Sequence, residues 1–474
     1  MIFTFIIIAF VLSFLVLVSK NKIITSISLS IFFISLLMLT TYSYQHINQT
    51  DSLYYKFDAI SILMTGILSV LSIASFYHSF LFLKRKNNSE KQKSIYFASL
   101  IMFITAMLSA YFTENMALLW VSIEATSLFV SILIFHSRDK NAMEATWKYL
   151  FISSAGLAIA FIGILFMSIV ASENGVSDLN FSSLLEIAQN MNPVWVKISF
   201  ILILTGFSVK MSIFPLYAVA IDAKTMAASP VNALMSTALV NVGFIGVFRI
   251  FTIIAKTSAF VWAQHILMIV GVISILITAI QLTRVKRLKR LLAFSSMEHM
   301  GLVVIGLAVG GIGFYAAILH LIFHSLIKAG LFYQLGSIRH YFKSIWIKDT
   351  GIYFKLNPLG ALALILGILS ILAIPPSGLF ISELMIFKAL FLNANYFVAI
   401  FVLFLLSVII YIIAKRTFHL LYADVSDDLL SENIKPNPYE TISQFVLFGL
   451  VIYLGINPPL FFTDLINAAI TVLN

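Results

Sequence analysis

Residues 314–335 read FYAAILHLIFHSLIKAGLFYQL, which is apolar enough to cross a bilayer although it carries three titratable side chains. His320, His324 and Lys328 recur every four residues, so in a helix they lie along one face. Successive members are about 6 Å apart along the axis, a gap that one bridging water can close. Histidine exchanges protons near neutral pH, and a buried lysine releases its proton more readily. Because three such groups do not neutralise one another, this line predicts a proton wire.

The composition of the whole chain is that of a polytopic membrane protein. Of 474 residues, 61% are hydrophobic and only 11% are charged, with a mean hydropathy of +1.02. Soluble domains do not bury so much apolar surface. The absence of cysteine excludes disulfides, thiolate metal sites and iron–sulfur clusters from this sequence. We attribute the net charge of +10 to basic cytoplasmic loops rather than to nucleic-acid binding.

Apolar runs predict about 14 transmembrane helices, and therefore an all-α fold with a single transmembrane domain over residues 1–474. The first run has no basic segment before it and no small-residue cleavage site, so we interpret it as a span rather than a signal peptide. The predicted runs cover residues 2–18, 23–41, 58–83, 94–112, 116–136, 146–171, 195–221, 228–252, 258–282, 290–310, 312–338, 358–393, 395–422 and 440–458.

Basic residues indicate how these spans are oriented. With the N-terminus outside, the loops after odd-numbered spans are cytoplasmic, and they hold most of the 30 Lys and Arg residues. These loops include the basic runs at 84–93 and 284–290, the segment 339–355, Lys224 and Lys435. We therefore expect a multi-pass protein of a bacterial inner (cell) membrane with both termini outside.

Prolines interrupt two of the predicted spans. Lys210 lies five residues before Pro215, and Pro375 with Pro376 precedes Glu383. A proline inside a helix removes a backbone donor and clashes with the preceding turn, so spans seven and twelve should be broken helices. The two breaks are five spans apart, which predicts two five-helix repeats over about 94–252 and 258–422. Because five is odd, the copies should be inverted.

Several ionisable residues fall inside predicted spans. Glu124, Lys210 and Glu383 lie near the middle of theirs, where a charge costs about 2.5–3.5 kcal/mol on insertion scales. Such residues usually face the protein interior, either as a structural pair or along a wet path. Glu298 and His299 lie in the first half of span ten, where a position near the cytoplasmic surface is an equal alternative.

At these residues the sequence resembles the antiporter-like subunits shared by respiratory complex I, cation/proton antiporters and membrane-bound hydrogenases. Within that family it looks most like component F of the formate-hydrogenlyase type of hydrogenase. The resemblance is strongest over residues 120–390. It rests on WVSIEATSL (120–128), EATWKYLF (144–151), VKMSIFPL (209–216), AASPVNALMS (227–236), LKRLLAFSSMEHMG (288–301), HLIFHSLIKAGLF (320–332) and PPSGLFISEL (375–384).

The resemblance implies roles for individual residues. Glu124 and Lys210 would form the first half-channel pair, His320, His324 and Lys328 the central relay, and Glu383 the exit-side group. Further candidates for the path are Glu298, His299, Lys148 and Asn241. The sequence departs from the family pattern where Asn241 replaces a lysine of span eight, where Arg287 replaces an acidic residue, and where Met226 replaces an acidic loop residue.

The expected function is that of a proton-translocating membrane subunit of a redox-driven oxidoreductase complex. It would carry no redox site, cofactor or metal of its own, and would bind other membrane subunits, a peripheral redox arm and the lipid bilayer. The alternative is a subunit of a secondary cation/proton antiporter or bicarbonate-uptake transporter. A b-type cytochrome is disfavoured, because His320 and His324 share one face and no second helix offers a clearly facing histidine.

Overall fold

The computed structural model describes residues 1–86, 88–344, 346–431 and 437–473, so Lys435 lies outside the described residues. Within them, thirteen helices are long and apolar enough to cross a membrane. The twelfth predicted span, 358–393, forms two shorter helices instead. The expected all-α membrane fold is therefore confirmed, with one small addition. Strands β1 (Thr50–Ser52) and β2 (Tyr55–Lys56) form an antiparallel hairpin in which Thr50 lies opposite Lys56.

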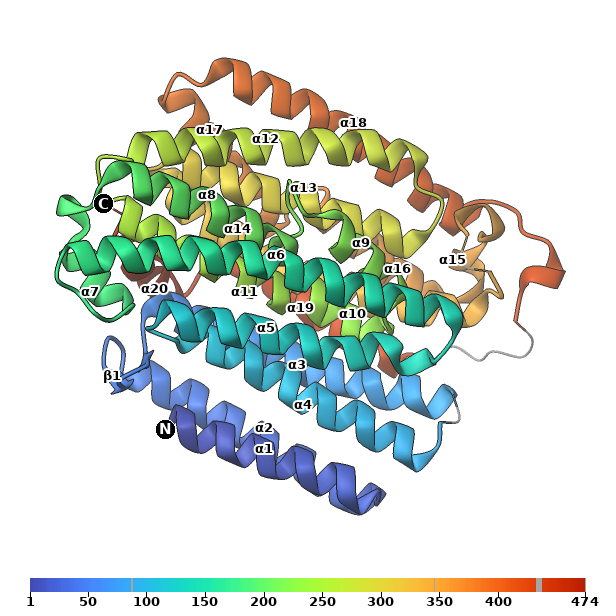
Figure 1. The fold of residues 1–474 in the computed structure, drawn as a ribbon. Coiled ribbons are helices and arrows are strands. Elements are labelled where there is room, and N and C mark those ends of the chain that lie inside the picture. The colour runs from blue at the N-terminus through green and yellow to red at the C-terminus, as the bar shows by residue number, and fades with distance from the viewer. Residues whose placement is uncertain (87, 345, 432–436, 474) are drawn as a thin grey trace. The chain divides into compact units, whose positions relative to one another are not determined.

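The helices follow one another along the chain in the order shown by the colours of Figure 1. They are α1 (Ile2–Ser19), α2 (Lys22–Gln45), α3 (Ala59–Arg85), α4 (Glu90–Phe112), α5 (Met116–Ile134), α6 (Lys140–Glu173), α7 (Phe181–Glu186), α8 (Pro193–Met211), α9 (Ala218–Met226), α10 (Ser229–Ser236), α11 (Ala238–Ile254), α12 (Phe260–Arg284), α13 (Leu288–Val309), α14 (Ile312–Tyr341), α15 (Tyr353–Leu356), α16 (Pro358–Ile371), α17 (Gly378–Leu392), α18 (Tyr396–Tyr422), α19 (Tyr439–Ile456) and α20 (Leu460–Ile470).

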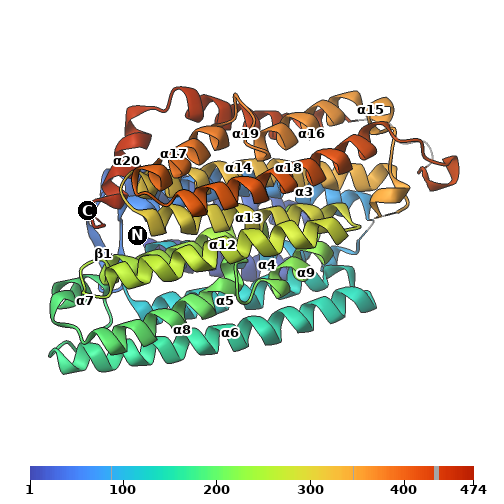
Figure 2. The same ribbon diagram turned by 90° about the horizontal axis from the view of Figure 1, so that it is seen from above.

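The chain divides into two compact units. The first contains residues 1–231, 238–265 and 464–474, and the second contains residues 232–237 and 266–463. In the first unit α8 packs against α6 and α11, and α5 packs against α6 (Figures 1 and 2). The α6–α8 contact depends on a glycine, because a Cβ on Gly206 would lie 2.5 Å from the Cβ of Ala160. Small residues at such crossings let membrane helices approach closely.

In the second unit α14 is the central helix, and it contacts α13, α16, α17 and α19 (Figure 2). The interior position of α13 and α14 explains why they can carry titratable groups. In α13 the whole apolar window is buried, whereas in α18 only one third of it is. Outward-facing side chains of α18, such as Phe397 and Phe404, are large, apolar and exposed. This is the pattern of a helix whose outer face meets lipid.

Both predicted helix breaks are present. The chain leaves helical geometry between α8 and α9 at residues 212–217, and between α16 and α17 at residues 372–377. A non-glycine residue adopts the left-handed conformation at each break, Ser212 with φ 60° and Ala373 with φ 51°. This region costs energy for such residues and is found where the surrounding structure imposes it. Each break also leaves helix-end carbonyls without a helical partner.

The predicted boundaries hold less well than the spans. Helix α6 begins at Lys140 rather than 146, because Asp139 caps it by accepting from the backbone N–H of Ala142 at 2.7 Å. The predicted loop at 172–194 contains the short helix α7, and α20 was not predicted. The predicted span at 228–252 is interrupted at Thr237, between α10 and α11. Helices as short as α7 and α20 lack the long apolar run from which the spans were predicted.

A buried ion pair holds the first unit together. The Arg249 guanidinium lies 2.8 Å from the Asp58 carboxylate and donates to the backbone oxygen of Tyr111 at 2.9 Å. It also donates to the hydroxyl of Ser61 at 3.0 Å. Only 7% of the Arg249 side chain is exposed. Helices α3, α4 and α11 are thereby tied to one guanidinium.

We expect Asp58→Asn to destabilise the protein by about 2–3 kcal/mol, because it leaves a buried guanidinium without its counter-charge. This is below the cost of breaking a fully buried pair, since Asp58 keeps some contact with solvent. The matched control is Lys148→Ala, which breaks an exposed pair and should leave the melting temperature almost unchanged. Thermal unfolding in detergent measures both, and equal melting temperatures for the two variants would contradict this prediction.

Candidate functional site

The first cluster of titratable groups surrounds Lys210, in the last turn of α8 just before the break. The side chain is 2% exposed. Its Nζ donates to the Ser127 hydroxyl at 2.6 Å and to the Tyr149 hydroxyl at 3.1 Å. The ammonium also lies 5.2 Å from the centre of the Tyr149 ring. Helix α11 comes close enough that a Cβ on Gly243 would lie 2.8 Å from the Lys210 Cβ. The lysine is therefore held from three sides.

Glu124 belongs to the same cluster, but it reaches Lys210 through a hydroxyl rather than directly. Its Oε2 accepts from Ser127 at 3.5 Å, and its Oε1 accepts from Ser154 at 2.6 Å. Ser127, one turn after Glu124 on α5, thus stands between the carboxylate and the ammonium. Glu124 is half-buried rather than fully enclosed. The predicted pair is brought together as a Lys210–Ser127–Glu124 chain.

The other two candidates in this unit differ from each other. Lys148 is exposed and forms an ion pair with Glu144, one turn earlier on α6, so it lies outside the buried cluster. Asn241 is fully buried on α11, two residues before Gly243. An amide carries no titratable proton, so Asn241 can only hold or orient a neighbouring group or water.

Lys224 corrects the loop assignment made from the sequence. It is only 1% exposed, lies in α9 rather than in a loop, and donates to the Ser212 hydroxyl at 2.8 Å. The break at Pro215 shortened the apolar run, so a charged residue beyond it resembled a loop residue. Lys210 and Lys224 are thus buried on the two sides of this break, and Ser212 accepts a hydrogen bond from Lys224.

The second cluster is built on α13, α14 and α17. The Nδ1 of His299 lies 3.1 Å from the Nε2 of His320, and the Nδ1 of His320 lies 3.0 Å from the Ser382 hydroxyl. Both histidines are fully buried. Glu383, next to Ser382, is half-buried, and its carboxylate approaches the two imidazoles to within 4.8 Å. His299 is therefore a central member of the cluster and does not lie near the surface.

Towards the C-terminal end of α14, helices α13 and α14 carry the rest of the line. The His324 ring centre is 5.3 Å from that of His299. Lys328, fully buried, donates to the Leu292 carbonyl at 2.6 Å and to the Ser295 hydroxyl. Glu298 on α13 is also buried and lies within electrostatic range of Lys328. His299 thus stands beside both histidines of α14, where the sequence predicted only a water.

The histidine geometry also bears on metal binding. The expectation that no second helix offers a facing histidine was wrong, because His299 of α13 faces His320. Two nitrogens that bind a haem iron from opposite sides lie about 4 Å apart, which is twice a metal–imidazole bond of about 2.0–2.1 Å. The 3.1 Å contact between His299 and His320 therefore does not fit a haem. His299, His320 and Glu383 could hold a small ion, yet Nδ1 of His299 and both nitrogens of His320 are already in hydrogen-bond contact. We therefore interpret the cluster as a relay.

Sequence reasoning missed the hydroxyl groups that connect these charges. Ser127, Tyr149, Ser295 and Ser382 each bond a titratable side chain, but serine and tyrosine are common in membrane helices and carry no signal alone. Ser127 stands three residues after Glu124, and Ser382 directly before Glu383. Because a hydroxyl one helical turn from a carboxylate can hydrogen-bond it, the spacing of Ser127 from Glu124 could have indicated this contact.

Comparison with known proteins identifies the family. Residues 113–409 match the family described as NADH:quinone oxidoreductase/Mrp antiporter, TM. This chain belongs to that family of polytopic membrane proteins. The hydrogenase-4 component F homolog of Methylacidiphilum infernorum is 30% identical over 59% of this chain and 60% of its own length. Hydrogenase-4 component B of Escherichia coli is 28% identical over 71% of this chain and 51% of its own length. The chain thus spans about half to three fifths of these relatives.

Solved structures agree on the fold. A chain of the membrane-bound sulfane sulfur reductase, an archaeal respiratory membrane complex, superposes with a TM-score of 0.86 and 21% identity. That match covers 100% of this chain and 97% of the other. A chain of the Mrp complex from Dietzia sp. DQ12-45-1b gives 0.85 and 16% identity over 99% and 96%. At these identities the likeness establishes the fold alone.

Proposed function

We propose that the protein is a proton-translocating membrane subunit of a redox-driven oxidoreductase complex. The observation that carries this proposal is the pair of buried clusters, each holding titratable groups in hydrogen-bond contact next to a broken helix. Burying such groups is expensive in a membrane, so they are rare where they have no role. The subunit would bind other membrane subunits and a peripheral redox arm, and hold no redox cofactor of its own.

In the first cluster, Lys210 is the group that takes up and releases the proton. Its ammonium is stabilised by Ser127, Tyr149 and, through Ser127, by the charge of Glu124. Movement of Ser127 away from Lys210 or Glu124 would weaken the stabilisation of the ammonium, so Lys210 would release its proton more easily. The helix break beside Lys210 supplies open carbonyls and room for water. Lys224, bonded to Ser212 in that break, is the next group along α9.

In the second cluster, protons pass along Lys328, His324, His299 and His320 towards Glu383. A neutral imidazole accepts a proton on one nitrogen and donates from the other, so the His299–His320 contact can transfer a proton and then reset. Ser382 holds the second nitrogen of His320 and so fixes the ring orientation. Glu298 offsets part of the positive charge when Lys328 is protonated.

We further propose that the two breaks belong to two inverted five-helix repeats, over about 94–252 and 258–422. Both breaks carry a left-handed non-glycine residue, and both are bridged by serine hydroxyls. Ser208 accepts from the N–H of Leu216 at 3.3 Å, and Ser377 donates to the Ser370 carbonyl at 3.0 Å. Alternating movement of two such copies would open each cluster to one side of the membrane in turn.

We infer a bacterial inner membrane location with both termini outside. Single cysteines in this cysteine-free sequence test the orientation by reaction with an impermeant maleimide. We expect a cysteine at Lys91, exposed in the first turn of α4 within the basic run 84–93, to react only after the membrane is opened. A cysteine at Leu53, which is 70% exposed beside the β hairpin, should react in intact cells. The reverse pattern would invert the proposed topology.

The second candidate is a secondary cation/proton antiporter subunit. It is favoured by the Na(+)/H(+) antiporter subunit A1 of Staphylococcus saprophyticus, which is 27% identical over 81% of this chain and 50% of its own length. The discriminating experiment is purification with native partners. Co-purification with a redox arm, together with proton uptake driven by electron transfer, supports the oxidoreductase. Sodium-driven proton movement without electron transfer supports the antiporter.

A further inference from the structure

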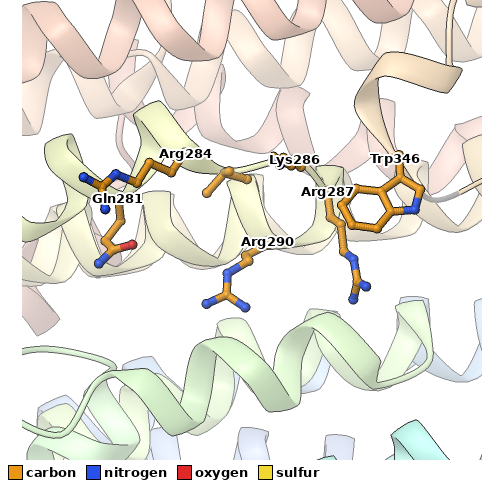
Figure 3. A pocket seen from close by; sticks show the side chains of 7 residues that line it. Gln281, Arg284, Lys286, Arg287, Arg290 and Trp346 are labelled. Atoms are coloured by element: carbon orange, nitrogen blue, oxygen red, sulfur yellow. The ribbon is translucent and has the colours of Figure 1, made fainter.

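The loop between α12 and α13 forms a basic pocket that the proton path does not use. Figure 3 shows its side chains, and its cavity volume is about 400 Å³. Arg284, Lys286, Arg287 and Arg290 line it together with Gln281, Val285 and Trp346. A second cavity of about 650 Å³ shares Lys286 and Trp346 and adds Lys348, Asp349 and Arg416. Six cations therefore face one carboxylate among the lining residues.

The loop is held in place by its own backbone rather than being a loose basic run. Arg287 pairs with Trp346 as an isolated antiparallel bridge, and the N–H of Ile347 donates to the Lys286 carbonyl at 2.9 Å. The Arg287 guanidinium lies 4.9 Å from the centre of the Trp346 ring. In Figure 3, Arg287 and Arg290 extend on the same side of the loop. Two guanidinium groups thus project from the same side of the pocket.

The one carboxylate among the lining residues, Asp349, offsets only one of these six charges. It accepts from the hydroxyl of Ser344, a residue of its own loop, at 2.6 Å. The start of α13 adds to the positive field, because its N-cap residue, Arg287, gives no side-chain hydrogen bond to the first-turn N–H groups. Guanidinium forks beside the positive end of a helix suit a tetrahedral oxyanion.

At the other basic run, 84–93, the described residues are arranged differently, although the run holds as many cations. At 84–93 the following helix, α4, begins with a capping box in which Ser89 and Gln92 satisfy each other's backbone N–H groups. Glu90 stands in the first turn and pairs with Lys93 at 2.8 Å. The helix end is already occupied there. The basic residues at 284–290 therefore line a cavity beside a helix start that has no side-chain cap, and do more than add to the basic charge of a loop.

We propose that the pocket formed by Arg284, Lys286, Arg287, Arg290 and Trp346 binds an anionic phosphate group, carried by a phospholipid head group or free in solution. Two guanidinium groups would grip the phosphate oxygens, as Arg does in bidentate pairs. Trp346 is 37% exposed and can lie at the level of the lipid glycerol, where tryptophan is enriched. By our orientation, the site faces the cytoplasmic leaflet.

Binding is tested on the delipidated full-length chain in detergent. Phosphatidylglycerol brominated near the glycerol should quench tryptophan fluorescence, and comparison with Trp346→Phe isolates the contribution of Trp346. We expect Arg287→Gln with Arg290→Gln to raise the half-saturating lipid fraction by about tenfold. Arg287→Lys with Arg290→Lys should recover part of that loss. The matched control, Lys84→Gln with Lys91→Gln in the capped loop, should bind as the unaltered chain does.

Two further arms distinguish the source of the phosphate. Preference for phosphatidylglycerol over equally brominated phosphatidylcholine, with no displacement by inorganic phosphate, assigns the site to a lipid. Displacement by inorganic phosphate, with no preference between the lipids, assigns it to free phosphate. The proposal is overturned if the double glutamine variant, eluting as a single species on size exclusion, binds both probes as tightly as the unaltered chain. It is also overturned if neither probe binds.

Discussion

Replacing Lys210 by alanine should abolish proton movement while leaving the protein assembled. The substitution removes the buried ammonium at the centre of the first cluster, and an alanine offers no group that can take up a proton at the end of α8. Loss of a positioned proton carrier lowers a transfer rate by about 100-fold or more. Assembly should survive, because removal of the lysine leaves neutral hydroxyls from Ser127 and Tyr149 and a half-exposed Glu124 that keeps Ser154 as a donor.

The structure sharpens this experiment, because Ser127 connects the two charges. Ser127→Ala removes the hydroxyl that accepts from Lys210 and donates to Glu124, so proton movement should fall by about tenfold, the effect of losing one hydrogen bond to a charged group. Ser127→Thr keeps the hydroxyl and is the matched control. In the double variant Ser127→Ala with Glu124→Gln, the two losses should be less than additive, since both break the same chain.

The measurement is proton uptake by inverted vesicles that contain the assembled complex, with the amount of complex checked on native gels. Proton uptake at the normal rate in Lys210→Ala would show that protons do not pass through the first cluster. Strictly additive losses in the double variant would mean that Glu124 acts independently of Ser127. Lys148→Ala, on the exposed surface of α6, should leave uptake unchanged.

The sequence could predict the spans and the breaks because each depends on local chemistry. Twenty consecutive apolar residues have few alternatives to a transmembrane helix, and a proline after Lys210 interrupts the ladder wherever that helix packs. The same reasoning from local apolar runs placed Lys224 in a loop, which was wrong. Once the apolar run had ended, nothing in the sequence indicated that α9 would bury a lysine against Ser212. That contact depends on how the chain turns at the break.

The connections between titratable groups could not be predicted, because they are made across helices. Spacing along α14 placed His320, His324 and Lys328 on one face, but it could not show which neighbour would fill the gaps. His299 fills one of them only because α13 packs against α14 with its histidine facing inwards. In the sequence, His299 stands 21 residues before His320, and no helical period relates the two.

This arrangement leads to a result that the sequence alone did not predict: His299→Phe should stop proton movement as completely as His320→Phe. Phenylalanine carries a flat apolar ring somewhat larger than imidazole, so it should occupy the site beside the two histidines of α14 while offering no nitrogen. A transfer that depended only on water between His320 and His324 would tolerate the change. We expect a loss of about 100-fold or more, because in the proposed relay the imidazole is itself a proton carrier.

The control for packing is Phe323→Leu, an apolar change at a fully buried neighbour on α14 that leaves every titratable group in place. It should lower stability modestly and leave the uptake rate per assembled complex unchanged. His299→Gln gives an intermediate case, because an amide can keep a hydrogen bond to His320 but cannot carry a proton at this site. If His299→Gln and His299→Phe both pump at the normal rate in assembled complexes, protons bypass His299 through water. If Gln restores uptake that Phe abolishes, His299 orients His320 instead of carrying the proton, because an amide can perform only that part of the task.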